Sequence, residues 1–126
     1  MSAFYGRHYR IATKTADYQI LEKDCGVIFN NAGAGGAVIF TLPNTATIQD
    51  GWNCRVFTMV LAQDVTVASY GSNDNIVTFN DIAADSIAFS TASERAGAGM
   101  LFVWDATNSK WMAFTSAEET QTMTVA

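Results

Sequence analysis

The chain has 126 residues, of which 49% are hydrophobic and 15% charged, and its formal net charge at pH 7 is −5. This length suits a single domain, and the acidic balance argues against binding to nucleic acid or to an anionic membrane surface. Because soluble proteins average about 25% charged residues, we expect part of the outer surface to be covered by other chains, in an oligomer or a larger assembly.

A basic arm opens the chain. Residues 1–14 contain Arg7, Arg10 and Lys14 and no acidic residue, so the remaining 112 residues carry a net charge of −8. The aromatic and cationic side chains near the start are Phe4, Tyr5, Arg7, Tyr9 and Arg10. This mixture suits docking on an acidic protein surface; the alternatives are a plain solvated terminus and contact with nucleic acid. We therefore predict an arm over residues 1–14 and one domain over residues 15–126.

Short runs rich in β-branched and aromatic residues follow the arm, separated by Gly, Asn, Asp and Pro. They cover residues 27–29, 37–42, 54–61, 65–67, 76–79, 86–90, 100–104 and 111–114. Pro43 cannot donate to a strand ladder and ends the second run, and Asp50-Gly51 turns the chain into the third. Runs of this kind at a spacing of about 8–12 residues predict an all-β, antiparallel domain.

Three segments are less regular. Residues 81–85 and 91–95 could each form one short helical turn. Residues 118–126 fit either a last strand or a loose end.

The chain holds one histidine, His8, and it lies in the basic arm, so no Ser/His/Asp set can be assembled. The loop Gly33-Ala34-Gly35-Gly36 has no Gly-Lys-Ser/Thr after it, and we interpret it as a hairpin loop that needs positive φ rather than a phosphate cradle. Single carboxylates in the remaining loops are expected to form turns. They are Asp64, Asp74, Asp81, Asp85 and Asp105. The sequence predicts no catalytic residue, no cofactor and no metal site.

Cys25 and Cys54 flank apolar runs and could pair across strands, but they match no metal or redox spacing, so we favour buried, reduced thiols. The start of the sequence has no signal-peptide pattern, and its longest apolar stretch is far shorter than the ~20 residues of a membrane span. These features predict synthesis in a cytoplasm and no membrane association.

Large aromatic residues are concentrated in the last two runs. We predict that Phe102, Trp104, Trp111 and Phe114 fill the core or a subunit contact. The alternative for the tryptophans, including Trp52, is a platform that binds carbohydrate.

Three stretches resemble a module of tailed-bacteriophage virion proteins. They are Thr15-Ala16-Asp17-Tyr18-Gln19-Ile20-Leu21, Asp24-Cys25-Gly26-Val27-Ile28-Phe29-Asn30 and Phe40-Thr41-Leu42-Pro43, with Gly51-Trp52 following. The module opens with Thr-x-x-Asp-Tyr and a later Asp-x-Gly, continues to Thr-Leu-Pro, and ends in a Val-Thr-Val strand. It occurs in tail fibres, in tailspikes and in small capsid-decoration proteins, and here it spans about residues 13–69.

The resemblance implies a β-sandwich, jelly-roll-like, that assembles as a homo-oligomer with a trimer favoured. Its implied role is a head decoration or cement protein on the outer capsid surface of a virion. The implied partner is the major capsid protein, with Phe4, Tyr5, Arg7, Tyr9 and Arg10 as the contact residues. The alternative is a tail fibre or tailspike module that binds host surface glycans. An enzyme, such as a depolymerase fragment, is the least favoured class.

Overall fold

The computed structural model describes residues 8–78, 81–89, 96–116 and 123–125, and these residues form two β-sheets. Sheet A contains, in spatial order, β1 (Arg10–Thr13), β3 (Val27–Asn30), β5 (Asn53–Phe57), β10 (Gly99–Asp105), β11 (Lys110–Ser116), β7 (Ile76–Thr78) and β8 (Asp81–Ala84). Sheet B contains β12 (Met123–Val125), β9 (Ser86–Phe89), β6 (Val65–Ala68), β4 (Val38–Thr41) and β2 (Tyr18–Gln19). Two 3₁₀ helices, Glu22–Asp24 and Thr45–Thr47, lie in the connections.

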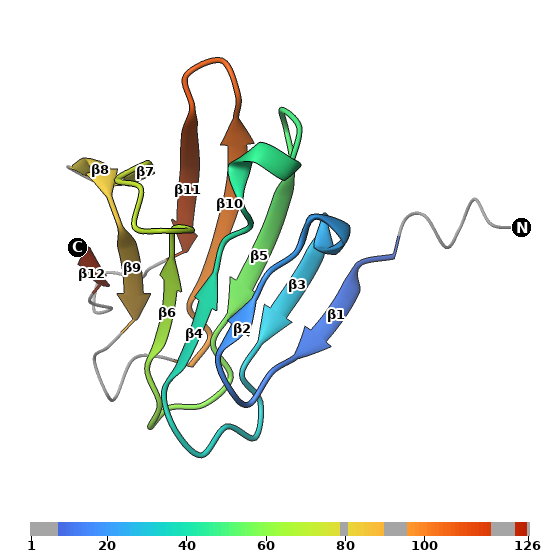
Figure 1. Cartoon of the computed structure of the whole chain (residues 1–126). Coiled ribbons are helices and arrows are strands. Elements are labelled where there is room, and N and C mark those ends of the chain that lie inside the picture. The colour runs from blue at the N-terminus through green and yellow to red at the C-terminus, as the bar shows by residue number, and fades with distance from the viewer. Residues whose placement is uncertain (1–7, 79–80, 90–95, 117–122, 126) are drawn as a thin grey trace, which may run out of the picture.

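The two sheets face each other across one shared core (Figure 1). The rings of Phe29 in sheet A and Phe40 in sheet B lie 5.5 Å apart and close one end of this core. At the other end Trp111 contacts both Trp52 and Trp104, at 5.7 and 5.2 Å between ring centroids. Large rings from both layers therefore hold the sheets together.

The all-β prediction is confirmed, but the antiparallel arrangement was wrong because both sheets are mixed. From β1 to β6 the chain alternates between the sheets, so each strand lies parallel to the strand two places earlier. The later strands add antiparallel pairs, including the β10–β11 hairpin and its pairing with β5. A jelly roll is built from antiparallel strands, so that part of the expectation is not confirmed.

Every predicted run contains a strand, and Pro43 and Gly51 do end and turn the chain as expected. Strands β1 and β2 were not predicted, and β8 replaces the helical turn expected over residues 81–85. Residues 91–95 lie outside the described part of the chain. The open question about the last residues is answered by β12, which pairs with β9. The Gly33 loop joins β3 in sheet A to β4 in sheet B, so it is not a hairpin, although Gly33 does have a positive φ of 78°.

The first half of the phage-like motif fixes the start of the fold. Tyr18 in β2 donates its hydroxyl to Asp24 Oδ2 at 2.9 Å, and the Leu21 amide donates to the same oxygen at 2.9 Å. Asp17 Oδ1 accepts the Ile39 amide at 2.9 Å, at the edge where β2 meets β4. Gly26 has φ of +80°, which favours glycine, directly before β3. Through these hydrogen bonds and the positive φ, the motif residues fix the path of the backbone around β2 and into β3.

The second half of the motif has the same kind of role. The Leu42 amide donates to Ala68 O at 2.8 Å and its side chain is fully buried. Gly51 has φ of +84°, and the Trp52 indole that follows donates to Glu22 O at 2.9 Å. The motif residues therefore link the end of β4 to β6 in sheet B, and the segment before β5 of sheet A to the first 3₁₀ helix.

Candidate interaction surface

One row of side chains crosses five strands on the outer face of sheet A. The registers of β1, β3, β5, β10 and β11 align Ile11, Ile28, Arg55, Leu101 and Phe114. We call these five residues the sheet A row. Four of its five members are apolar, although alternation in a strand places them on the side away from the core.

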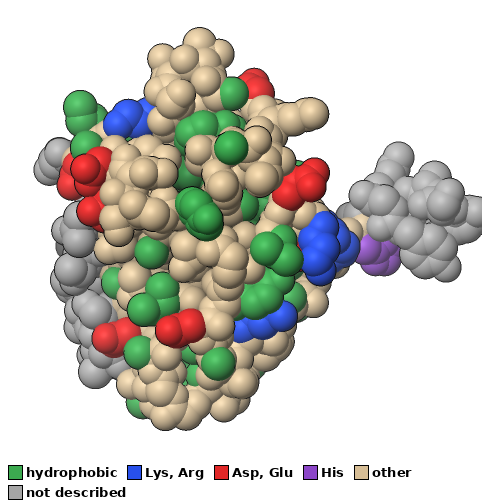
Figure 2. Space-filling view, in the orientation of Figure 1, with side chains coloured by type: hydrophobic (Ala, Val, Ile, Leu, Met, Phe, Trp, Pro, Cys, Tyr) green, Lys and Arg blue, Asp and Glu red, His purple; other side chains and the backbone are tan. Residues whose placement is uncertain are grey.

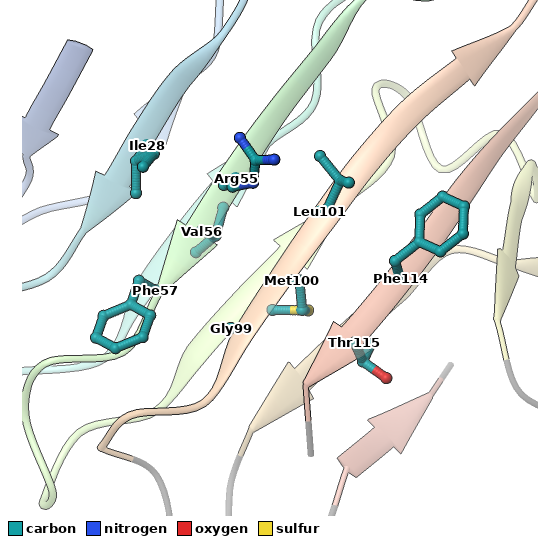
Figure 3. A pocket seen from close by; sticks show the side chains of 9 residues that line it. All are labelled: Ile28, Arg55, Val56, Phe57, Gly99, Met100, Leu101, Phe114 and Thr115. Carbon is teal, nitrogen blue, oxygen red and sulfur yellow. The ribbon is translucent and has the colours of Figure 1, made fainter. Parts of the chain in front are cut away.

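The sheet A row is exposed to an extent that is unusual for apolar side chains. Ile11 is 70% exposed and Phe114 is 55% exposed, while Ile28 and Leu101 are half-buried. Phe57 lies two residues after Arg55 on the same face of β5, extends this surface and is 39% exposed. Figure 3 shows Ile28, Arg55, Phe57, Leu101 and Phe114 on β3, β5, β10 and β11 around a shallow hollow, with Val56 and Met100 on the buried side of the same strands. A contiguous apolar surface of this kind typically marks a site where another molecule docks.

The outer face of sheet B differs. Apart from Ile39, its described side chains are small or polar, and they are Gln19, Thr41, Thr66, Ala68, Ser86 and Ala88. Figure 2, in the orientation of Figure 1 with β4 and β6 toward the viewer, shows small groups of apolar side chains separated by polar side chains and backbone. Among the described residues, the outer face of sheet A is therefore the more apolar of the two.

A basic and aromatic corner adjoins the sheet A row. The Arg55 guanidinium carbon lies 5.0 Å from the centroid of the Tyr9 ring, within the range of a cation–π contact. Arg10 donates to the carbonyl oxygens of Lys23, at 3.3 Å, and of Cys25. Tyr9 and Arg10, two of the predicted capsid-contact residues, thus lie beside the row.

The structure places the remaining predicted contact residues as follows. Phe4, Tyr5 and Arg7 lie outside the described residues. Residues 10–13 of the predicted arm form strand β1 of sheet A.

The four aromatic residues predicted for the core or a subunit contact separate into two groups. Phe102 and Trp111 are fully buried and Trp104 is 6% exposed, so these three belong to the core. Phe114 belongs to the sheet A row. Trp52 is also buried, at 6% exposed, so the three indoles do not form an open platform for carbohydrate.

Sequence reasoning missed Arg55 and the aliphatic members of the row. A signal was present, because residues 100–104 are large and apolar at every position. A strand that is apolar on both sides is typically covered on both sides, yet among the described residues only the inner side of β10 is covered.

The carboxylates form local contacts. Asp85 Oδ1 accepts the Asp74 amide at 2.8 Å. A hydrogen bond between the two carboxyl groups, and their mutual repulsion, raise the pKa of Asp74. Asn108 donates to both oxygens of Asp105 and lowers the pKa of that carboxyl. Within residues 8–78, 81–89, 96–116 and 123–125, no group of three or more His, Cys, Asp and Glu side chains is arranged to hold a metal ion.

The two cysteines are both free thiols, but only one is buried. Cys54 lies in the core and its burial raises the pKa of the thiol, whereas Cys25 is exposed at the turn before β3. The expectation of two buried thiols was therefore wrong for Cys25, because that turn lies at the surface.

No described helix has the length and apolar character needed to cross a membrane.

No protein-family model and no curated protein sequence matches the chain. The case for a function therefore depends on the sheet A row, on the corner formed by Tyr9, Arg10 and Arg55, and on the motif residues.

Proposed function

We propose that this chain is a non-enzymatic structural protein of a tailed-phage virion, which decorates the head and stabilises it by binding assembled major capsid protein. The observation that carries the proposal is the sheet A row. Among the described residues it makes the outer face of sheet A the more apolar of the two, with the cationic Arg55 at the centre of the row and Tyr9 against it. A protein that must attach by one side and remain in solvent on the other needs this division.

The structural role of the motif residues supports the link to virion proteins. Tyr18, Asp24 and Gly26 hold the connection between β2 and β3 in place through a shared carboxylate and a positive φ. Residues that determine the backbone in this way specify a fold, so a resemblance at these positions supports a resemblance in architecture. Position on the outer capsid surface and synthesis in the host cytoplasm belong to the same proposal.

Stabilisation of the shell follows from binding that is selective for the assembled state. A ligand that binds the assembled form and not the separated subunits shifts the equilibrium toward assembly by mass action. A homo-oligomer, and a trimer in particular, would attach through several equivalent faces at once, so a modest affinity per chain adds up to firm retention.

Co-sedimentation with phage particles tests the proposal. The purified full chain is mixed with mature heads that lack it, with immature proheads and with isolated tails. We expect saturable binding to mature heads alone. Binding to tails or to host cells instead would contradict the proposal and favour the tail module that recognises glycans, which the buried indoles do not support.

A further inference from the structure

Arg55 occupies the centre of the sheet A row and is its one charged member. The strand registers place Ile28 on one side of it and Leu101 on the other, and Ile11 and Phe114 complete the row at its two ends. Any surface that covers these four apolar side chains must also cover the guanidinium, which then loses its contact with water. An arginine buried without a carboxylate is strongly destabilising, and a well-placed carboxylate removes most of that cost.

Within the described part of the chain the charge of Arg55 is only partly accommodated. The Tyr9 ring lies against the guanidinium, at 5.0 Å from its carbon, but an aromatic face accepts no strong hydrogen bond. Among the residues that the structure describes, Arg55 forms no ion pair. The planar fork of N–H donors is therefore held beside the ring and remains open to an acceptor from outside.

A second copy in a two-fold contact does not supply that acceptor. In such a contact the same surface lies on both sides, and residues at its centre meet their own equivalents. Since Arg55 is the third of five members of the row, a two-fold contact centred on the row would bring two guanidinium groups together. The surface that covers the row must be different from the row itself.

We infer that the capsid surface bound by the sheet A row is apolar and carries a carboxylate that pairs with Arg55. This inference rests on the proposed function and adds the chemistry of the partner. The apolar members provide the area of contact, and the arginine–carboxylate pair, which is bidentate in favourable geometry, fixes the position of the partner along the row.

The decisive experiment is the substitution Arg55→Met, measured by co-sedimentation with mature heads that lack the protein. Methionine keeps most of the apolar stem and removes the charge. If the capsid surface carries the carboxylate, its charge is left unpaired in the contact, and we expect binding about 30-fold weaker or more. If the capsid surface is apolar throughout, the substitution leaves binding unchanged or makes it tighter, and the inference is overturned.

Lys14→Met is the matched control. The Lys14 ammonium also lies over a tyrosine ring, at 4.0 Å from the centroid of Tyr18, but it is not a member of the sheet A row. The control variant should bind as the unmodified chain does, and a loss equal to that of Arg55→Met would show a general effect of charge. Arg55→Lys should recover part of the binding, because it restores the charge without the planar fork.

Two further results separate the failure of this inference from the failure of the proposed function. If the unmodified chain does not bind heads, the proposed function fails and the substitutions carry no information about the capsid. If Arg55→Met changes the sedimentation coefficient of the free protein, the row is a contact between copies and the inference is overturned. Tryptophan emission from the buried indoles reports whether each variant is folded.

Discussion

Phe102 and Phe114 give a direct test of which side of sheet A faces the core. Both are phenylalanines on adjacent strands of one hairpin, but Phe102 is fully buried and Phe114 is 55% exposed. Replacing Phe102 by Ala removes a ring from a packed core, and we expect a loss of about 3–5 kcal/mol in the free energy of unfolding. For Phe114→Ala we expect about 1 kcal/mol or less, because a fully buried ring contributes about 1.5–3 kcal/mol and here less than half of the surface is covered.

Urea denaturation followed by tryptophan fluorescence measures both losses, since the buried Trp104 and Trp111 lie on the same two strands. The unmodified chain and the two variants should unfold with the same slope, so that the midpoints report stability alone. Equal losses, or a larger loss for Phe114→Ala, would refute the assignment. A shift of one residue in a strand moves every side chain to the other face, and the sheet A row would then be the core side.

Three other predictions concern separate parts of the structure. Trp104→Ala should cost about 3–5 kcal/mol in urea denaturation, and a negligible loss would contradict its place in the core. Gly26→Ala should cost about 1–2 kcal/mol because φ is +80°, whereas Gly35→Ala, where φ is not in that region and no atom lies within 4 Å of the added Cβ, should be neutral or slightly stabilising. Because Asp85 raises the pKa of Asp74, the ionised pair is unfavourable above that pKa and its cost disappears as pH falls through it. Asp74→Asn should therefore stabilise the chain at pH 7 and lose its advantage near pH 3, as compared by urea denaturation at both values.

Local patterns in the sequence are sufficient to locate most of the strands. Residues 100–104 are large and apolar throughout, and residues 111–114 begin and end with an aromatic residue; both runs lie within the strands of the β10–β11 hairpin. Strand β8 has the sequence Asp-Ile-Ala-Ala, which has low β propensity, and it pairs with a short neighbour through an irregular register. Its position depends on tertiary contacts that no local pattern contains.

The partner of each strand could not be predicted in the same way. Short connections between β-runs usually indicate hairpins, and the antiparallel prediction follows from this tendency. A short connection can also cross the ~10 Å between two packed sheets, and from β1 to β6 each connection does so. Alternation with period two predicts which side chains face the core, but two arrangements satisfy it equally: hairpins within one sheet and crossings between two sheets. The choice between them depends on contacts such as the Tyr18–Asp24 hydrogen bond, which ties β2 to the 3₁₀ helix within such a connection.

The candidate surface could not be predicted from local sequence patterns either. Phe114 was grouped with Phe102 because the residue type and the setting in an apolar run are alike in both. Only the strand register, which aligns Phe114 with Leu101 and Arg55, shows that Phe102 and Phe114 lie on opposite faces of sheet A. Arg55 itself lies in a run whose other members are mostly apolar. An arginine among apolar residues on a strand indicates a covered charge or an exposed face, and the register decides between these. Among the described residues the face is exposed, and we therefore propose one partner surface that covers both the apolar row and its central cation.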